Sequence, residues 1–184
     1  LLADEFRPFG FEVVGKTIQE LVVPTPETSA LLAVAELIIS VPLRFGETRK
    51  LVGSRLEIVG LPLTLSPTTR ERLAQLPLQL RIGMIATEAI FVQSIRNIVS
   101  IYHPAAEGAP VAVIDDRRAV SALVANVDVV IYSMGIRERI QDVLPRNVLA
   151  IELTHIPDPA AVAELRDEIR AIAERHQESS AMVT

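Results

Sequence analysis

The stretch SALLAVAELIIS, Ser29 to Ser40, decides the expected fold because a similar stretch, SALVANVDVVIYS, follows at Ser121 to Ser133. In each copy, a small apolar run typical of a helix ends at an acidic residue, Glu36 or Asp128. A strand-like run follows and ends at a serine. A recurrence of this length predicts that the two halves of the chain share an architecture.

The recurrence extends well beyond these two strands. Residues 47–73 match residues 137–166, and the offset is 92 residues at the first serines and 90 at Pro67 and Pro157. A nearly constant offset through helix, strand and helix predicts two related lobes, and its period is too long for a solenoid repeat. We expect a first lobe over residues 1–76, a second over residues 77–178 and a disordered tail over residues 179–184.

Alternation of strand and helix patterns predicts an α/β fold in which each lobe is a Rossmann-like, mostly parallel sheet with right-handed crossovers. Helices are expected where Thr25, Ser66 and Asp158 act as N-caps, because a proline follows each of them at the first helical position. The last helix is expected to end near His176. Apolar runs predict strands over residues 11–23, 36–41, 55–61, 80–86, 111–115, 127–133 and 148–153.

The first lobe lacks a counterpart of the strand over residues 80–86 and of most of the helix that follows it. The chain also begins at Leu1 without an initiator methionine. We therefore expect an N-terminally truncated first lobe, the alternative being that the two lobes are unequal.

Composition restricts the function classes. The 184 residues are 49% hydrophobic and 22% charged, which is typical of a globular protein. A net charge of −5 disfavours direct nucleic-acid binding by this segment. The absence of cysteine excludes disulfides and thiol chemistry and fits a cytoplasmic protein. No apolar run reaches the roughly 18 residues of a membrane span, and no signal segment opens the chain, so no membrane partner is expected.

The carboxyl ends of the strands are where ligands bind in open α/β sheets. Ser40 and Ser133 stand out there because they recur at matching strand ends, and Arg44 and Arg117 suit an anionic group. The candidate ligand-binding residues, which offer hydroxyl, guanidinium, carboxylate and imidazole groups, are Ser40, Arg44, Thr64, Thr87, Glu88, Asp115, Arg117, Ser133, Thr154 and His155.

Motifs for catalysis are absent. The sequence contains no glycine-rich phosphate loop and no nucleophile elbow, and its three histidines lack metal-ligand spacing. The pair Asp115 and Asp116 resembles that of phospho-acceptor receiver domains, but no lysine ends the last strand. One member of this pair, and also Thr87, is explained equally well as a helix cap. We therefore expect a non-enzymatic protein with no metal and no cofactor.

Four segments carry a resemblance to a known family: AELIISVPLRFGETRKL, LPLTLSPTTRERLAQLPLQLRIGMIATE, VDVVIYSMGIRERI and VLAIELTHIPDPAAVAELR. Together they cover most of residues 35–166. The succession resembles the periplasmic-binding-protein-like effector-sensing domains of GntR-type bacterial one-component transcription regulators. The resemblance implies a cytoplasmic homodimer that binds a small-molecule effector between its lobes. It further implies that DNA is bound only by a winged helix upstream of Leu1, because these residues contain no helix-turn-helix pattern.

Two other functions stay open at this point. A two-lobe enzyme of small anionic metabolites, similar to a phosphoribosyltransferase or a racemase, is disfavoured by the missing phosphate loop and the missing paired cysteines. A solute-binding protein is disfavoured by the small size and by the absence of a signal segment. The regulatory domain is therefore the leading hypothesis.

Overall fold

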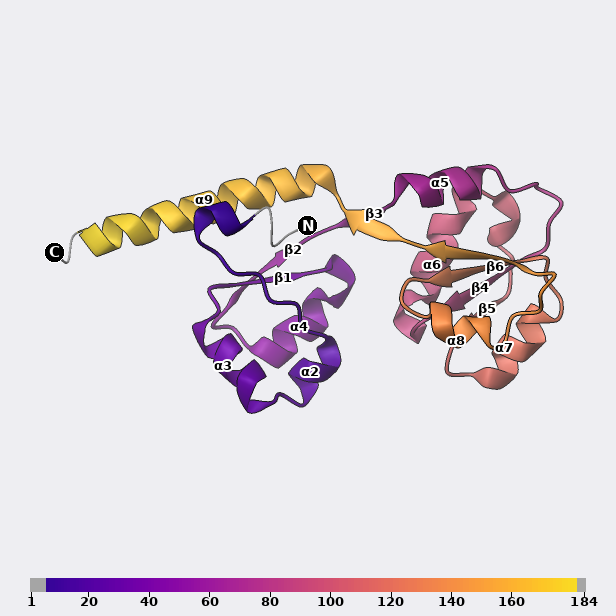
Figure 1. Cartoon of the computed structure of the whole chain (residues 1–184), viewed down its shortest axis with the longest axis horizontal. Helices are drawn as coiled ribbons and strands as arrows, with labels where there is room; N and C mark the ends of the chain where they lie inside the picture. The colour runs from indigo at the N-terminus through magenta and orange to yellow at the C-terminus, as the bar shows by residue number, and fades with distance from the viewer. Residues whose placement is uncertain (1–5, 182–184) are drawn as a thin grey trace. The chain divides into compact units, whose positions relative to one another are not determined.

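The computed structural model describes residues 6–181, and the side chains of residues 6–174, as two compact α/β units (Figure 1). The first unit contains the residues up to Leu63 together with those from Pro157 onward, and the second contains Thr64–Ile156. This division differs from the expected boundary after residue 76. Residues 64–76 belong to the second unit, and the C-terminal helix belongs to the first.

The first unit is built on two parallel strands, β1 (Leu37–Ser40) and β2 (Glu57–Gly60). Leu37 and Ile39 pack with Leu165 and Ile169 of the C-terminal helix. The helical elements of this unit are η1 (Arg7–Phe9), α2 (Ile18–Val22), α3 (Pro26–Val34), η2 (Pro42–Arg44), α4 (Phe45–Val52) and α9 (Pro159–Ala181).

The second unit contains a four-stranded parallel sheet in the order β5-β4-β6-β7. Its strands are β4 (Ile82–Ala86), β5 (Val111–Val113), β6 (Val129–Ser133) and β7 (Leu149–Leu153). Its helical elements are α5 (Pro67–Ala74), η3 (Ala89–Phe91), α6 (Val92–Ser100), η4 (Pro104–Ala106), α7 (Arg117–Val124) and α8 (Arg137–Gln141).

Helices cover both faces of this sheet. Leu73 of α5 and Ile95 of α6 share one core cluster with Met84 and Ile131, whereas Leu123 of α7 and Ile140 of α8 belong to the cluster on the opposite face. Parallel strands are apolar throughout when both of their faces are covered. That explains why β4 is buried along its whole length.

The chain crosses between the units twice, through β3 (Leu63–Leu65) and β8 (His155–Pro157), and these two short strands pair with each other. The helix after each crossing packs on the unit that the chain has just entered: Leu73 of α5 in the second unit and Leu165 of α9 in the first. This reciprocal placement accounts for the difference from the expected lobe boundary.

Element order recurs between the halves. Apart from the short η2, the series α3-β1-α4-β2-β3-α5 recurs as α7-β6-α8-β7-β8-α9, and β4, η3, α6, η4 and β5 lie between the two series. In both parallel pairs the partner residue lies 20 positions further along the chain, Leu37 opposite Glu57 and Val129 opposite Leu149.

Predicted caps begin several helices. The hydroxyls of Thr25 and Ser66 accept hydrogen bonds from the backbone N–H groups of Thr28 and Thr69, each with proline at the first helical position. Asp158 caps α9 through the N–H groups of Ala160 and Ala161.

The predicted strand over residues 11–23 is wrong. Residues 11–17 have no regular secondary structure, and helix α2 begins at Ile18. The cause is a capping box: the Thr17 hydroxyl accepts a bond from the Glu20 N–H at 3.3 Å, and the Glu20 carboxylate accepts one from the Thr17 N–H at 2.7 Å. These local bonds outweigh the strand propensity of the valines and isoleucine.

The C-terminal helix is longer than the sequence indicates. Helix α9 continues through Ala181, so residues 179–181 are helical, contrary to the predicted tail. The rest of that predicted tail, residues 182–184, lies outside the described residues.

Hydrogen bonds between Asp128 and Arg81 join the start of β6 to the start of β4, and we call this contact the Asp128 clip. The Asp128 carboxylate accepts bonds from Arg81 Nε, Nη2 and backbone N at 2.7–3.0 Å, and these bonds lower the Asp128 pKa to about 2. Because the folded pKa lies below the unfolded value of about 3.9, the clip stabilises the fold above about pH 4 and is lost as the pH falls toward 2.

We expect an NMR titration to place the Asp128 carboxyl near pKa 2. Asp128→Asn is expected to lower the melting temperature at neutral pH. Below about pH 2 the variant and the wild type should have the same melting temperature, because the Asp128 carboxyl is then largely protonated. Asp142→Asn, at an exposed position of the same unit, is the control. A titration near the ordinary aspartate pKa would contradict the clip.

Candidate functional site

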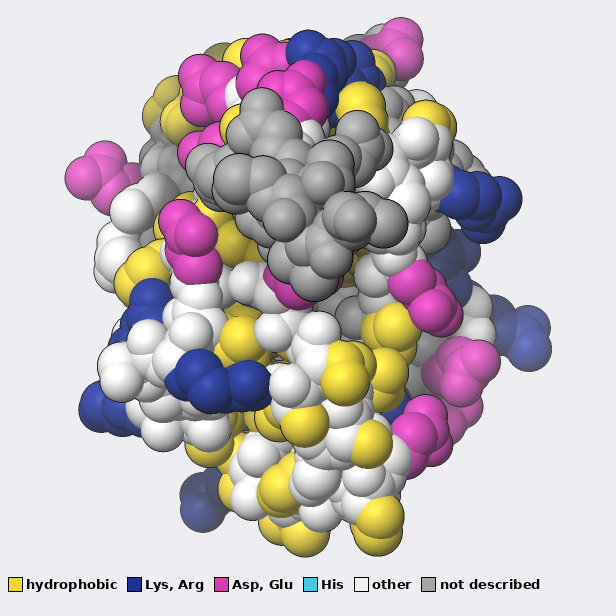
Figure 2. All heavy atoms as spheres, turned by 90° about the vertical axis from the view of Figure 1, so that its left-hand side faces the viewer, with side chains coloured by type: hydrophobic (Ala, Val, Ile, Leu, Met, Phe, Trp, Pro, Cys, Tyr) yellow, Lys and Arg dark blue, Asp and Glu magenta, His cyan; other side chains and the backbone are white. Residues whose placement is uncertain are grey.

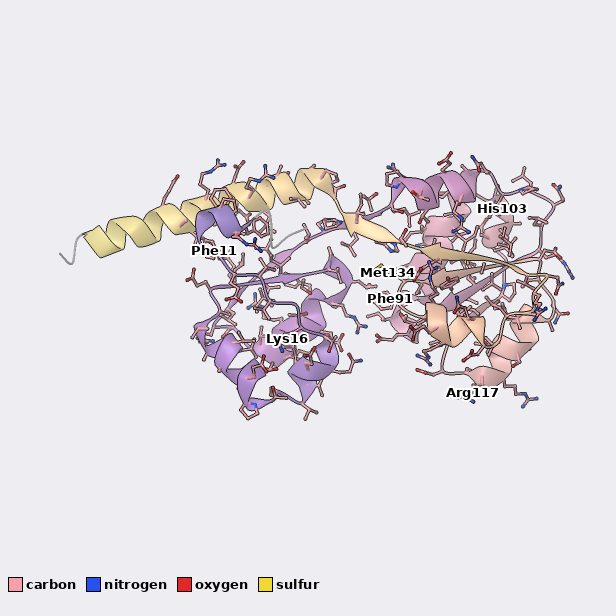
Figure 3. The ribbon with its side chains drawn as sticks, in the orientation of Figure 1. Phe11, Lys16, Phe91, His103, Arg117 and Met134 are labelled. Atoms are coloured by element: carbon pink, nitrogen blue, oxygen red, sulfur yellow. The ribbon has the colours of Figure 1, made fainter. Side chains whose placement is uncertain are left out.

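The carboxyl edge of the four-stranded sheet brings two predicted site residues together. The Thr87 N–H, directly after β4, donates a 3.4 Å hydrogen bond to Ser133 Oγ at the end of β6. Thr87 is not a helix cap, because η3 begins only at Ala89. Phe91 and Met134 lie at the same end of this unit (Figure 3). This edge is therefore polar at its centre, with an exposed methionine beside it.

The remaining predicted residues of this edge do not converge with Thr87 and Ser133. The exposed Asp115 forms a 2.5 Å ion pair with Arg139. Its neighbour Asp116 caps α7 through the Ala119 N–H at 2.9 Å. Arg117 is exposed on α7 (Figure 3), and Glu88 is partly buried. Because both partners of the Asp115–Arg139 ion pair are exposed, solvent screens the pair and it adds little stability.

Glu152 on β7 was missed by the sequence analysis, yet it organises the loop after β6. Its carboxylate accepts bonds from the Gly135 N–H at 3.1 Å and from Arg137 Nη2 at 2.7 Å. Burial acts to raise the Glu152 pKa, but these hydrogen bonds outweigh it and the pKa is lowered. Gly135 has a φ of 86°, which glycine adopts most readily. A lone carboxylate inside an apolar strand was the available sequence signal.

Thr154 has a structural role. Its hydroxyl lies 2.6 Å from both Ser66 Oγ and Thr69 Oγ1, so it ties the end of β7 to the start of α5. Thr64 lies in β3, and His155 is a partly buried residue of β8. Burial lowers the His155 pKa, and a hydrogen bond with the Leu153 backbone opposes that effect only in part. The Thr154 hydroxyl is therefore engaged in hydrogen bonds that hold the fold together.

The first unit contains a cavity of about 660 Å³ that runs along β1. We call it the β1 cavity. Its polar lining includes Ser40, Arg44 and Thr48, and the Ser40 and Thr48 hydroxyls lie 3.0 Å apart. Lys16, shown in Figure 3, is a further lining residue. Its apolar lining includes Phe11, Val13, Leu31, Leu32, Ile169 and Ile172.

Two buried threonines contribute to this cavity. The Thr28 hydroxyl lies 3.2 Å from the Thr25 hydroxyl. The Thr48 hydroxyl lies within hydrogen-bond distance of the Ser40 hydroxyl. The cavity volume lies within the roughly 300–1,000 Å³ range of small-molecule sites, which are mostly apolar with a few placed polar groups. The β1 cavity therefore fits a ligand-binding site better than the sheet edge of the second unit does.

The predicted site residues thus fall into two sets. Ser40 and Arg44 line the β1 cavity, whereas the second unit contains Thr64, Thr87, Glu88, Asp115, Arg117, Ser133, Thr154 and His155. Lys16, Thr28 and Thr48 were missed, because the sequence rule examined only residues directly after strands. Lys16 lay in a segment predicted to be a strand, and the two threonines lie within helices.

His103 has a structural role. It is fully buried beside α6, and its Nε2 lies 3.2 Å from the Pro77 carbonyl oxygen. Its Nδ1 is buried without a hydrogen-bond partner. A fully enclosed ring of this kind serves packing and cannot meet a ligand.

Within residues 6–174, no group of three or more histidine, aspartate or glutamate side chains is placed to hold a metal ion. None of the helices in the described part of the chain is both long and apolar enough to cross a membrane. No protein-family model matches the chain, and no curated protein sequence matches it significantly.

Proposed function

We propose that this chain is a non-catalytic ligand-binding module, the effector-sensing part of a bacterial transcription regulator. The observation that carries the proposal is the β1 cavity, in which Ser40, Arg44 and Thr48 provide polar groups among apolar walls. The recurring element order and the shared 20-residue register support the resemblance to effector-sensing domains.

Occupancy of such a cavity can regulate a second domain if the ligand favours one of two conformations. A difference of about 1–3 kcal/mol in binding free energy is sufficient for regulation. In this proposal the module acts as a cytoplasmic homodimer and reaches DNA only through a separate winged-helix domain. The polar groups around the β1 cavity bind and orient a ligand, and the proposal assigns them no bond-breaking step.

The test is a metabolite screen on the whole isotopically labelled chain. We expect ligands that raise the melting temperature to shift the NMR resonances of Ser40, Val41 and Thr48. Leu31→Phe should narrow the cavity, and because overpacking costs about 1–3 kcal/mol, it should weaken binding about tenfold or more. Leu78→Phe is the matched control, since Leu78 is 66% exposed in the second unit.

Two outcomes would contradict the proposal. Resonance shifts confined to Thr87, Asp115 and Ser133 would move the site to the second unit. Chemical conversion of a bound metabolite by the purified chain would show an enzyme.

A further inference from the structure

One edge of β1 carries backbone groups that form no hydrogen bond within the described part of the chain, residues 6–181. The Leu61 N–H donates to the Ser40 carbonyl at 2.8 Å, and Ser40 lies opposite Gly60. In a parallel ladder, alternate residues direct both backbone groups to the same neighbour. Ile38 and Ser40 therefore face β2, whereas Leu37 and Ile39 face away from it. Within residues 6–181, no hydrogen bond to the Ile39 N–H or C=O is recorded.

This unpaired edge opens into the β1 cavity. Residues 36–41 line the cavity along the whole of β1. β1 is only partly buried along its length, so an occupant that pairs with these backbone groups replaces water as their hydrogen-bond partner and adds these bonds to its apolar contacts. The cavity therefore offers a donor and an acceptor spaced as a neighbouring strand requires.

The walls of the cavity are apolar on both faces of the sheet. Ile169 of α9 packs in one cluster with Ile39, and Ile172 of α9 and Leu31 and Leu32 of α3 also line the cavity. An added strand would thus have covered faces like those of an interior parallel strand, whose side chains are apolar on both sides. This arrangement favours an extended occupant with small or branched apolar side chains.

Charges around the cavity are balanced. Lys16 Nζ lies 3.3 Å from Glu20 Oε1 and 3.9 Å from Glu27 Oε1, and Arg44 Nη1 lies 2.6 Å from Glu47 Oε2. The lining also includes Glu12 and Glu36. Acidic and basic side chains are likewise interspersed on the face of the molecule in Figure 2. Nothing in this balance favours the anionic effector that the sequence suggested, and an uncharged occupant needs no counter-ion.

We propose that the ligand of the β1 cavity is a short, extended, uncharged apolar peptide that pairs with the free edge of β1 through Ile39. The proposal rests on the ligand-binding function given above and names the ligand class. β1 has four residues, and a strand rises about 3.3 Å per residue, so a segment of about four residues matches it. Main-chain bonds provide the affinity of such strand addition, and side-chain pockets provide its specificity.

The experiment uses the whole chain and N-acetylated, C-amidated tetrapeptides of valine, leucine and alanine. Two N-methylated forms of the best binder serve as a matched pair. In one form the first and third amides are methylated, and in the other the second and fourth. Because only one set faces β1, we expect one form to bind about tenfold or more weakly and the other to keep its affinity. Hydrogen exchange of the Ile39 amide should slow on binding, whereas the Ile38 and Ser40 amides should be protected throughout.

The outcomes separate this inference from the proposed function. If a ligand without amides shifts Ser40 and Thr48 while no tetrapeptide binds, the module binds ligands but the peptide class is wrong. Equal affinity of both N-methylated forms, or unchanged exchange at Ile39, would also overturn strand pairing. If neither class of ligand reaches the cavity, both proposals fail.

Discussion

Gly83→Ala is expected to destabilise the second unit by about 1–3 kcal/mol, the usual effect of overpacking a core. A Cβ at residue 83 would lie 2.5 Å from Leu123 Cδ2 and 3.0 Å from Val127 Cγ1. Leu123 and Val127 are both buried, so the added methyl group would meet core side chains that have to shift. For a unit of this size, each kcal/mol lowers the melting temperature by about 4–8 °C, which thermal unfolding monitored by circular dichroism will detect.

Gly108→Ala, in the same unit, is the matched control. The Cβ that it adds would have no neighbouring heavy atom within 4 Å. A second variant identifies the cause. Leu123→Val in the Gly83→Ala background should recover part of the lost stability, since contacting residues do not contribute additively. If Gly83→Ala unfolds at the wild-type temperature, the close packing of α7 on β4 is wrong.

Leu73→Ala and Leu165→Ala are expected to destabilise different units, each by about 2–5 kcal/mol. Leu73 of α5 is fully buried in the second unit, and Leu165 of α9 is 2% exposed in the first. Leu73→Ala should therefore speed amide hydrogen exchange at Ile131 of β6 and leave Ile38 of β1 unchanged. Leu165→Ala should do the reverse.

This pair tests the assignment of the two helices, because each variant is the control for the other. The boundary expected from the sequence, after residue 76, places Leu73 with β1 and Leu165 with β6. Loss of protection at Ile38 in Leu73→Ala would support that boundary and contradict the reciprocal placement of α5 and α9.

Strands and helix starts were predictable from the sequence where residues close together in the chain determine them. Strands β4 and β6 were confirmed because continuous apolar runs need both faces covered. Helix starts at Ser66 and Asp158 were confirmed because a cap and its proline lie within one turn. The segment around Thr17 failed because the capping box was overlooked, although Thr17 and Glu20 have the required spacing.

The candidate site was only partly predictable. The rule that ligands bind at strand ends identified Ser40 and Arg44, which line the β1 cavity. The same rule could not show that the Thr154 hydroxyl is engaged by Ser66 and Thr69, because those residues are 85 or more positions away in the chain. Nor could it identify the free edge of β1, since strand neighbours depend on pairing between distant segments.

By itself, the sequence determined the α/β class, the parallel strands and most helix starts, because these follow from side-chain periodicity and from bonds within a few residues. Only the tertiary structure decided which sheet each helix covers. Leu73 of α5 and Leu165 of α9 are apolar and become buried, but nothing in the sequence of either helix indicates the sheet against which it packs. The β1 cavity depends on the same decision, because α9 returns from the far end of the chain to provide one of its walls.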